Sequence, residues 1–296
     1  MTNITILDGG MGQELIHRYG QPPTPLWSTH VMMHEPNLVG DIHDDYFASG
    51  GQVATTNTYA IHRDRLIRHD AANGTSLTGD FAALHQKACE IASRSRDKNG
   101  SGQIASSLGP LGFSYRPDLS FPPEEAAETF GEIAKIHEPY VDFHLIETAS
   151  SIEHAKGALM GASVSSKPTW LAVSVKDDDG TKLRSGEQLY EVKMLIEEFS
   201  PSALLINCST PEAVSNAIPV IADIDIPFGA YANGFTFITS DFTKTETVDA
   251  LEARNDLGPN QYADFCQQWV DMGATILGGC CEVGPAHIAE LNKRFG

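Results

Sequence analysis

The chain has 296 residues, 41% of them hydrophobic, and it is strongly acidic: 20 Lys and Arg stand against 39 Asp and Glu, a formal net charge of −19. This charge argues against nucleic acid as a partner, because phosphates need a basic surface. No apolar run approaches the roughly 20 residues that cross a bilayer, and residues 1–7 lack the basic and apolar regions of a signal peptide. We therefore expect a cytoplasmic protein without membrane contact, and the sequence does not indicate its oligomeric state.

Short apolar runs alternate with amphipathic, helix-like stretches along the whole chain. The predicted strands are residues 4–7, 52–55, 103–107, 142–147, 170–175, 203–207, 227–231 and 274–277. The amphipathic stretches include residues 36–48, 80–96, 124–140, 151–159, 186–199, 211–221, 260–272 and 285–295. A strand followed by a helix eight times over is the count of a (β/α)8 TIM barrel. We therefore predict a single α/β domain of this type over residues 1–296.

The alternative architecture is a doubly wound open sheet with a nucleotide-binding Gly-x-Gly-x-x-Gly turn after the first strand. Here Gly9, Gly10 and Gly12 follow Asp8 at a different spacing. Polar or metal-binding side chains instead stand at the carboxyl end of every predicted strand, where barrel enzymes place their chemistry. In chain order these are Asp8, Thr56 to Tyr59, Ser106 and Ser107, Glu147 and Thr148, Ser174, Cys208, Asn233, and Cys280 with Cys281. This recurrence favours the barrel.

Cysteines from two remote parts of the chain suggest a metal site. Cys280 and Cys281 are adjacent, so on a regular strand their side chains would point to opposite faces. The preceding Gly278 and Gly279 give the backbone the freedom to turn there. If Cys208, at the end of the sixth strand, joins them, three thiolates bind a soft metal such as zinc and leave its fourth position open, the catalytic arrangement. The alternatives are three small apolar residues at strand ends, or a Cys280–Cys281 redox pair, which is awkward to bridge.

Other residues with metal-binding side chains have simpler interpretations. His30 and His34 have helical spacing but no acid in an obvious role, which indicates surface or supporting histidines. Residues 177–180, Asp-Asp-Asp-Gly, indicate a solvated turn and lack the spacing of a calcium loop. Cys89 and Cys266 fall in helix-like segments and are interpreted as core thiols.

Seven short motifs, in chain order, resemble the homocysteine S-methyltransferase family, zinc barrels that methylate the thiol of homocysteine to give methionine. These are Asp8-Gly9-Gly10-Met11-Gly12-Gln13-Glu14-Leu15, Thr56-Asn57-Thr58-Tyr59, Ser107-Leu108-Gly109-Pro110, Glu147-Thr148, Asn207-Cys208, Tyr231-Ala232-Asn233-Gly234 and Gly278-Gly279-Cys280-Cys281. The resemblance covers nearly the whole chain, and its cysteine motifs are the most specific. Glu282, Ala232 and Phe235 depart from the family pattern in loops over the expected pocket.

The resemblance implies a role for each matching residue. Cys208, Cys280 and Cys281 would be the zinc ligands, and Tyr59 would lie close to the reacting sulfur. Asn233 would lie near the metal when substrate is absent. The substrate contacts, in which Asp8 and Glu147 hold the amino acid, would be Asp8, Gly9, Thr56, Asn57, Ser107, Glu147 and Asn233. The alternative interpretations are capping or rim ion pairs for the two acids and a core position for Tyr59.

The resemblance also implies the reaction. Coordination to zinc deprotonates a thiol, so homocysteine would attack a methyl group on a cationic donor. Short members of the family use S-methylmethionine, while betaine or a separate corrinoid protein are alternative donors. Trp27 and Trp170 are candidate aromatic walls for the onium methyl group. A zinc hydrolase would need histidine or carboxylate ligands. A structural zinc site or a sulfur-metabolite sensor would need a fourth protein ligand, such as Asn233 or a histidine.

Overall fold

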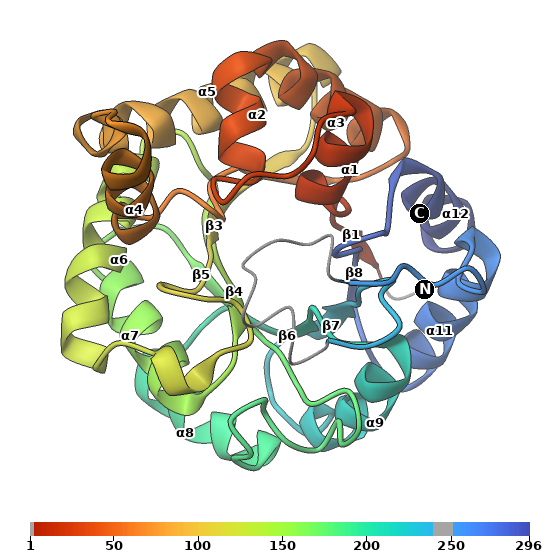
Figure 1. The fold of residues 1–296 in the computed structure, drawn as a ribbon. Helices are drawn as coiled ribbons and strands as arrows, with labels where there is room; N and C mark the ends of the chain where they lie inside the picture. Colours follow the sequence, from red (N-terminus) through yellow and green to blue (C-terminus); the bar gives the residue numbers. More distant parts are fainter. Residues whose placement is uncertain (1–2, 239–250) are drawn as a thin grey trace.

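Eight parallel strands form one sheet in the computed structural model, which describes residues 3–238 and 251–296. The strands are β1 (Thr5–Ile6), β2 (Val53–Thr55), β3 (Gln103–Leu108), β4 (Phe143–Ala149), β5 (Thr169–Val173), β6 (Ala203–Asn207), β7 (Phe228–Tyr231) and β8 (Ile276–Leu277). Their order is β1-β8-β7-β6-β5-β4-β3-β2. A parallel bridge between Leu7 and Val53 brings β1 beside β2, so the sheet closes on itself (Figure 1). The predicted TIM barrel is confirmed.

Helices surround the barrel and face solvent on their outer sides (Figure 1). The α-helices are α1 (Met11–Tyr19), α2 (Ser28–His34), α3 (Pro36–Ala48), α4 (Arg63–Asn73), α5 (Phe81–Asn99), α6 (Pro123–His137), α7 (Ile152–Ala162), α8 (Lys193–Phe199), α9 (Pro211–Ile221), α11 (Pro259–Asp271) and α12 (Pro285–Phe295). Short 3-10 helices are η1 (Leu77–Asp80), η2 (Pro117–Leu119) and η3 (Leu189–Val192). Helices α1, α2 and α4 are not among the amphipathic stretches predicted from sequence. One predicted helix also extends over residues 186–199, where the chain forms a loop, η3 and α8.

Local start signals explain several helix boundaries. Proline occupies the first turn of α6, α9, α11 and α12, where its missing N–H costs no hydrogen bond. The side chain of Ser151 accepts from the amide of His154 at the start of α7. Thr210 does the same for Ala213 at the start of α9. Each cap therefore satisfies an amide that the helix itself leaves unbonded.

The core consists of two layers, as the alternation of side chains along a strand dictates. Inward-facing residues fill the barrel, among them Leu145, Leu205 and Ile276. Outward-facing residues such as Ile146, Leu204 and Leu277 pack against the helices. Cys89 and Cys266 are fully buried, as predicted. Among the described helices, none combines the length and apolar character of a membrane span.

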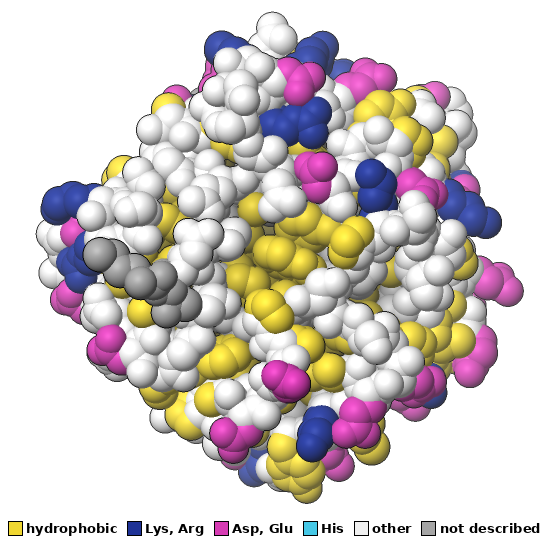
Figure 2. Space-filling model, turned by 180° about the vertical axis from the view of Figure 1, so that it is seen from behind, with side chains coloured by type: hydrophobic (Ala, Val, Ile, Leu, Met, Phe, Trp, Pro, Cys, Tyr) yellow, Lys and Arg dark blue, Asp and Glu magenta, His cyan; other side chains and the backbone are white. Residues whose placement is uncertain are grey.

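Most charged side chains lie on the outer surface. On the face opposite to that of Figure 1, hydrophobic side chains gather near the middle, and Lys, Arg, Asp and Glu lie mostly around the periphery (Figure 2). Inside the barrel the packed side chains are apolar, and Trp170 stacks on Phe143 there at 4.1 Å between ring centroids. Charge is thus kept away from the inside of the barrel except at the site described below.

Six histidines are an exception to the apolar composition of the core. They are at most 7% exposed and comprise His43, His62, His85, His137, His144 and His154. His85 and His137 share a hydrogen bond of 2.8 Å between ring nitrogens. Burial lowers the pKa of His43, His144 and His154 to about 4 and that of His62 and His85 to about 3, and it lowers the pKa of His137 as well. The folded protein therefore holds these rings in the neutral form at neutral pH.

We expect this histidine set to make the fold sensitive to acid. Each of these histidines has a lower pKa in the folded protein than its unfolded value of about 6.5. Its contribution to the free energy of unfolding is therefore complete above pH 6.5 and is lost as the pH falls toward 4. At pH 5 each of the five rings with a pKa of about 3 or 4 costs about 2 kcal/mol, so these five together approach the total stability of about 5–15 kcal/mol of a typical protein. Two buried carboxylates, Asp8 and Glu147, oppose the trend but are outnumbered. Urea unfolding at pH 7, 6 and 5 should show the midpoint falling steeply.

His43 offers a direct control for this expectation. It is fully buried on α3, and neither ring nitrogen has a hydrogen-bond partner. His43→Leu should therefore fold. Between pH 6 and pH 5 the unfolding free energy of this variant should decrease by about 1 kcal/mol less than that of the parent chain. An unchanged slope would contradict the assignment of a depressed pKa to this ring.

Candidate active site

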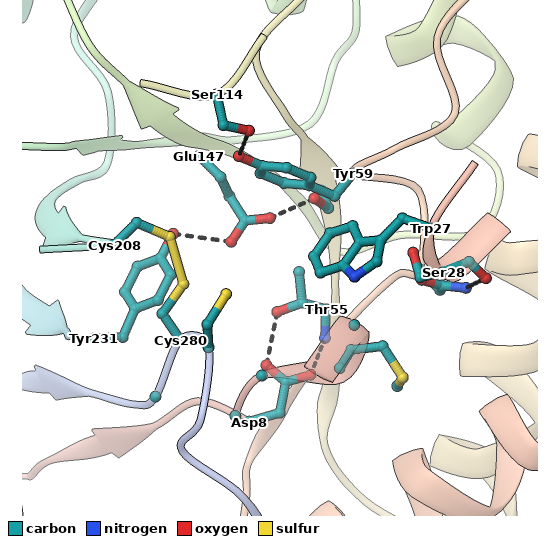
Figure 3. A pocket seen from close by; sticks show the side chains of 18 of the residues that line it. Asp8, Trp27, Ser28, Thr55, Tyr59, Ser114, Glu147, Cys208, Tyr231 and Cys280 are labelled. Carbon is teal, nitrogen blue, oxygen red and sulfur yellow. Dashed lines mark hydrogen bonds between the residues drawn. A yellow bond between two sulfur atoms is a disulfide. The ribbon is translucent and has the colours of Figure 1, made fainter. Parts of the chain in front are cut away.

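One pocket opens at the carboxyl ends of the strands and draws its walls from the last residues of β2, β3, β4 and β7 and from the loops after β1, β2, β3, β6, β7 and β8. Ten of the eleven residues predicted for the site line it: Asp8, Gly9, Thr56, Asn57, Tyr59, Ser107, Glu147, Cys208, Cys280 and Cys281. Side chains from these distant segments point toward one another across the pocket (Figure 3). The topology of the barrel thus gathers residues that are spread over more than 270 positions of the chain.

The sulfur atoms lie together at one side of the pocket. Cys208 and Cys280 are joined as a disulfide, with their Cα atoms 5.8 Å apart (Figure 3). Cys281 is a free thiol that also lines the pocket. Burial, with a smaller contribution from the charge of Glu282, raises the pKa of the Cys281 thiol to about 12. The predicted convergence of Cys208 with the adjacent pair is therefore present, and the bridge is Cys208–Cys280 rather than Cys280–Cys281.

These three cysteines form a donor set that fits zinc once the disulfide is reduced. Zinc is bound by a small number of ligands and favours soft sulfur atoms, and here such atoms from two strand ends meet in one cavity. In the disulfide form two of the sulfurs are bonded to each other. Accordingly, within residues 3–238 and 251–296 no three His, Cys, Asp or Glu side chains are arranged as metal ligands.

The turn at the adjacent cysteines depends on close packing. Gly278 and Gly279 were predicted to let the backbone turn through conformations that other residues disfavour, but neither has a positive φ. A Cβ at Gly278 would lie 2.6 Å from the Cβ of Leu7, and one at Gly279 would overlap Val283. Glycine is needed because the neighbouring segments approach so closely. In the two cysteine segments, positive φ values are instead found at Cys208 (47°) and at Glu282 (63°).

Two buried carboxylates face the cavity from β1 and β4. Asp8 is 4% exposed and accepts hydrogen bonds from the amide of Thr55 at 2.6 Å and from its hydroxyl at 2.8 Å. Glu147 accepts from the hydroxyls of Ser107 and Tyr231, the latter at 3.1 Å. Burial raises the pKa of Asp8 to about 7 and raises the pKa of Glu147. Of the described residues, none forms an ion pair with either acid, which argues against the rim ion pairs considered from sequence.

Aromatic rings form the wall across from the sulfurs. Tyr59 lines the pocket, and its hydroxyl lies 2.8 Å from the Oγ of Ser114. Trp27 packs its ring edge-on to that of Tyr59, at 6.0 Å between centroids, and holds a positive φ of 47°. Burial raises the pKa of Tyr59 to about 12, so the phenol stays neutral. Trp170 is outside this wall: it stacks in the barrel interior, which contradicts its prediction as a donor contact.

Comparison with known proteins identifies the family. The model of the homocysteine S-methyltransferase family matches residues 5–295. This chain belongs to the homocysteine S-methyltransferase family.

Members of the family resemble the chain over almost its full length. The homocysteine S-methyltransferase of Escherichia coli K12 is 29% identical, with 99% of this chain and 95% of the relative covered. The selenocysteine Se-methyltransferase of Brassica oleracea var. italica is 25% identical, with 98% and 88% covered. The crystal structure of the E. coli homocysteine methyltransferase MmuM in a metallated form aligns with a TM-score of 0.79 at 26% identity, over 99% of this chain and 96% of that chain. An oxidized form of MmuM gives 0.80 at 25%, over 98% and 96%.

One predicted site residue, Asn233, is not among the described residues that line the pocket, although the amide of the next residue, Gly234, donates to the carbonyl of Cys281 at 2.8 Å, so its place near the metal stays a prediction. Asn233 is fully buried, and its Oδ1 accepts from the amide of Phe235 at 3.1 Å. Glu282 and Phe235, which depart from the family pattern, lie beside the cavity. Glu282 is held by Gln13 at 2.6 Å and lies 3.6 Å from His17. Phe235 packs with Tyr115 and Cys208.

Several pocket residues of this family member were missed from sequence. Thr55 fixes Asp8, and Tyr231 fixes Glu147. The signal for Tyr231 was present, because it is the last residue of a predicted strand and alternation turns it inward. Ser114 and Tyr115 come from the loop after β3, whose path over the pocket depends on tertiary packing and leaves no periodic pattern.

Proposed function

We propose that this protein transfers a methyl group from a cationic donor, S-methylmethionine, to the thiol of homocysteine and so produces methionine. The observation that carries the proposal is the meeting of three cysteines with two buried acids in one pocket. One part suits a sulfur nucleophile, and the other suits the ammonium group of an amino acid. Family membership and the names of its relatives support the same reaction.

In this proposal Cys208, Cys280 and Cys281 hold a zinc ion after reduction of the disulfide. A bound zinc ion supplies positive charge that keeps a substrate thiol deprotonated at neutral pH. The metallated form of MmuM supports a metal in the family fold. A pocket that works through reduced thiols suits the reducing conditions of the cytoplasm, where we propose that this single barrel acts.

The remaining pocket residues bind and orient the two substrates. Asp8 and Glu147 accept the ammonium group of homocysteine, and Thr55, Ser107 and Tyr231 fix the direction of their oxygens. Trp27 and Tyr59 would offer their ring faces to the onium methyl group, an interaction that favours cations. The acids leave the cavity with net negative charge, and the donor is positively charged. The contacts that bind the two substrates thus surround the two reacting sulfur atoms.

The test is a methylation assay on reduced protein loaded with zinc and freed of excess metal. Homocysteine would be the acceptor, and the donors would be S-methylmethionine, S-adenosylmethionine, betaine and a methylated corrinoid protein. We expect methionine with S-methylmethionine and slower turnover with S-adenosylmethionine. If methionine forms only with betaine or with the corrinoid protein, that compound and not S-methylmethionine is the methyl donor. Zinc binding with no methyl transfer from any donor would favour a sulfur-metabolite sensor instead.

A further inference from the structure

A buried ion pair lies behind the cysteines, in the segment between β5 and η3. Residues 177–180 were predicted to form a solvated turn, and for Asp177 this prediction is wrong. Its side chain is 1% exposed, and that of Arg184 is 10% exposed. The guanidinium donates to the carboxylate from both terminal nitrogens, at 3.1 and 3.3 Å. Neither residue lines the pocket, so this charge pair serves something other than substrate contact.

Arg184 reaches the main chain of Cys208. Its Nη2 donates to the Cys208 carbonyl oxygen at 3.0 Å, and its Nε donates to the hydroxyl of Ser174 at 2.7 Å. The Ser174 hydroxyl in turn donates to the same carbonyl at 3.2 Å. Two donors therefore fix the carbonyl of a residue whose φ is 47°. That conformation is disfavoured for a residue with a side chain, so it persists because its surroundings hold it.

Asp177 extends the same network to two further loops. Its oxygens accept from the amide of Thr210, at the start of α9, and from the amide of Ile238, each at 3.1 Å. The Arg184 guanidinium also lies over the ring of Tyr115, 4.7 Å from its centroid. Tyr115, Ile238 and Cys208 then pack together in one apolar cluster, against which Cys280 and Cys281 are partly buried. The pair thus connects the loops after β3, β5, β6 and β7 around the sulfur atoms.

The geometry points to Arg184 and Asp177 as a positioning pair that sets the direction of the Cys208 thiol and thereby the affinity of the three-cysteine site for its metal. This role rests on the proposed function, because that function makes Cys208 a metal ligand. The pair acts through the Cys208 main chain: with the carbonyl held, the backbone cannot leave its left-handed conformation, and Sγ stays directed at Cys280. Residues that orient metal ligands in this way typically change metal affinity by about 10- to 100-fold when altered.

Arg184→Lys is the sharpest variant for the test. A lysine ammonium keeps the charge opposite Asp177 but lacks the planar fork that reaches Asp177, Ser174 and the Cys208 carbonyl together. The matched control is Arg254→Lys. Arg254 is 14% exposed and, like Arg184, is held by ion pairing, here with two carboxylates, those of Glu212 and Asp256, but its side chain has no described bond to a cysteine residue. Ser174→Ala is the second variant, since it removes one donor to the carbonyl and leaves the ion pair intact.

The primary measurement is zinc affinity of reduced protein by competition with a chromophoric chelator, together with thermal unfolding of the metal-free form. We expect Arg184→Lys to lose about 10- to 100-fold in zinc affinity and Ser174→Ala to lose a smaller factor, with Arg254→Lys unchanged. Affinity of Arg184→Lys within twofold of the parent chain would overturn the inference. An equal loss in Arg254→Lys would also overturn it, because a general loosening of the fold would then suffice.

A second measurement needs no metal and separates this inference from the proposed function. Reduced protein is equilibrated with oxidized glutathione, which accepts the two electrons of the Cys208 and Cys280 thiols and leaves as two glutathione thiols while the disulfide forms. Because Arg184 holds Cys208 toward Cys280, we expect Arg184→Lys to need about tenfold more oxidized glutathione for half conversion. An unchanged equilibrium contradicts the positioning role. Absence of methyl transfer in the parent chain, with this shift present, would remove the proposed function alone.

Discussion

Replacement of Cys208 or Cys281 by serine is expected to abolish methyl transfer, with a loss of at least about 10³-fold in kcat, equivalent to about 4 kcal/mol of barrier. The physical reason is the charge on sulfur. In this cavity burial raises the pKa of Cys281 to about 12, so a thiolate at neutral pH requires a neighbouring cation. A serine hydroxyl does not take the place of a thiolate as a ligand for a soft ion. Zinc content and initial rates of methionine formation measure the effect.

The two cysteine variants differ in a way that makes the result specific. In Cys281→Ser the disulfide partners Cys208 and Cys280 are both kept, whereas Cys208→Ser removes one of them. Thiol titration under oxidizing conditions should therefore distinguish the variants, while zinc content and turnover fall in both. Cys89→Ala, which removes a buried thiol that does not line the pocket, should keep metal and activity and lose about 1 kcal/mol of stability. Full zinc content and parental turnover in Cys208→Ser would refute the proposed site.

Much of the fold could be predicted because strands and helices of a barrel have different periodicities. The bounds of β6 were predicted to the residue, and those of α3, α9 and α12 likewise, since each is a strongly patterned segment with proline or a buried run at its ends. Helix α4 escaped prediction because only Leu66 in it is buried. Its sequence therefore carries almost no apolar periodicity.

The site was predictable to the extent that the carboxyl ends of parallel strands must meet. Asp8, Glu147 and the three cysteines follow from that rule. The Cys208–Cys280 bridge does not, because strand order alone does not decide which sulfurs face each other. Asp177 illustrates a second limit. Three consecutive aspartates favour a solvated turn, and only the approach of Arg184, seven residues on, reverses this for the first of them.

Asp8→Asn is expected to raise the KM for homocysteine by roughly 30- to 100-fold, about 2–3 kcal/mol, because the substrate ammonium loses a charged partner in a buried site. Asparagine can keep both contacts with Thr55, so the backbone geometry should persist. Glu147→Gln should act in the same direction through its loss of charge. Initial rates over a range of homocysteine give kcat and KM separately. Glu132→Gln, which breaks an exposed pair with Arg63, is the control and should match the parent chain.

The pH dependence gives this prediction a second signature with opposite signs for binding and stability. Below its pKa of about 7 Asp8 is protonated, so the ammonium of homocysteine must displace a proton, and KM should rise up to tenfold per pH unit below 7. Because the substrate thiol titrates equally with either protein, the ratio of parental to Asp8→Asn KM isolates the carboxylate. The same raised pKa favours the folded state below the unfolded value of 3.8, and that contribution is lost as the pH rises through 7. At pH 8 Asp8→Asn should therefore be more stable than the parent chain by up to about 4 kcal/mol, and the gain should vanish near pH 4. A variant that binds homocysteine weakly and is not stabilised at pH 8 would show that the Asp8 carboxylate is not held as an unneutralised buried charge.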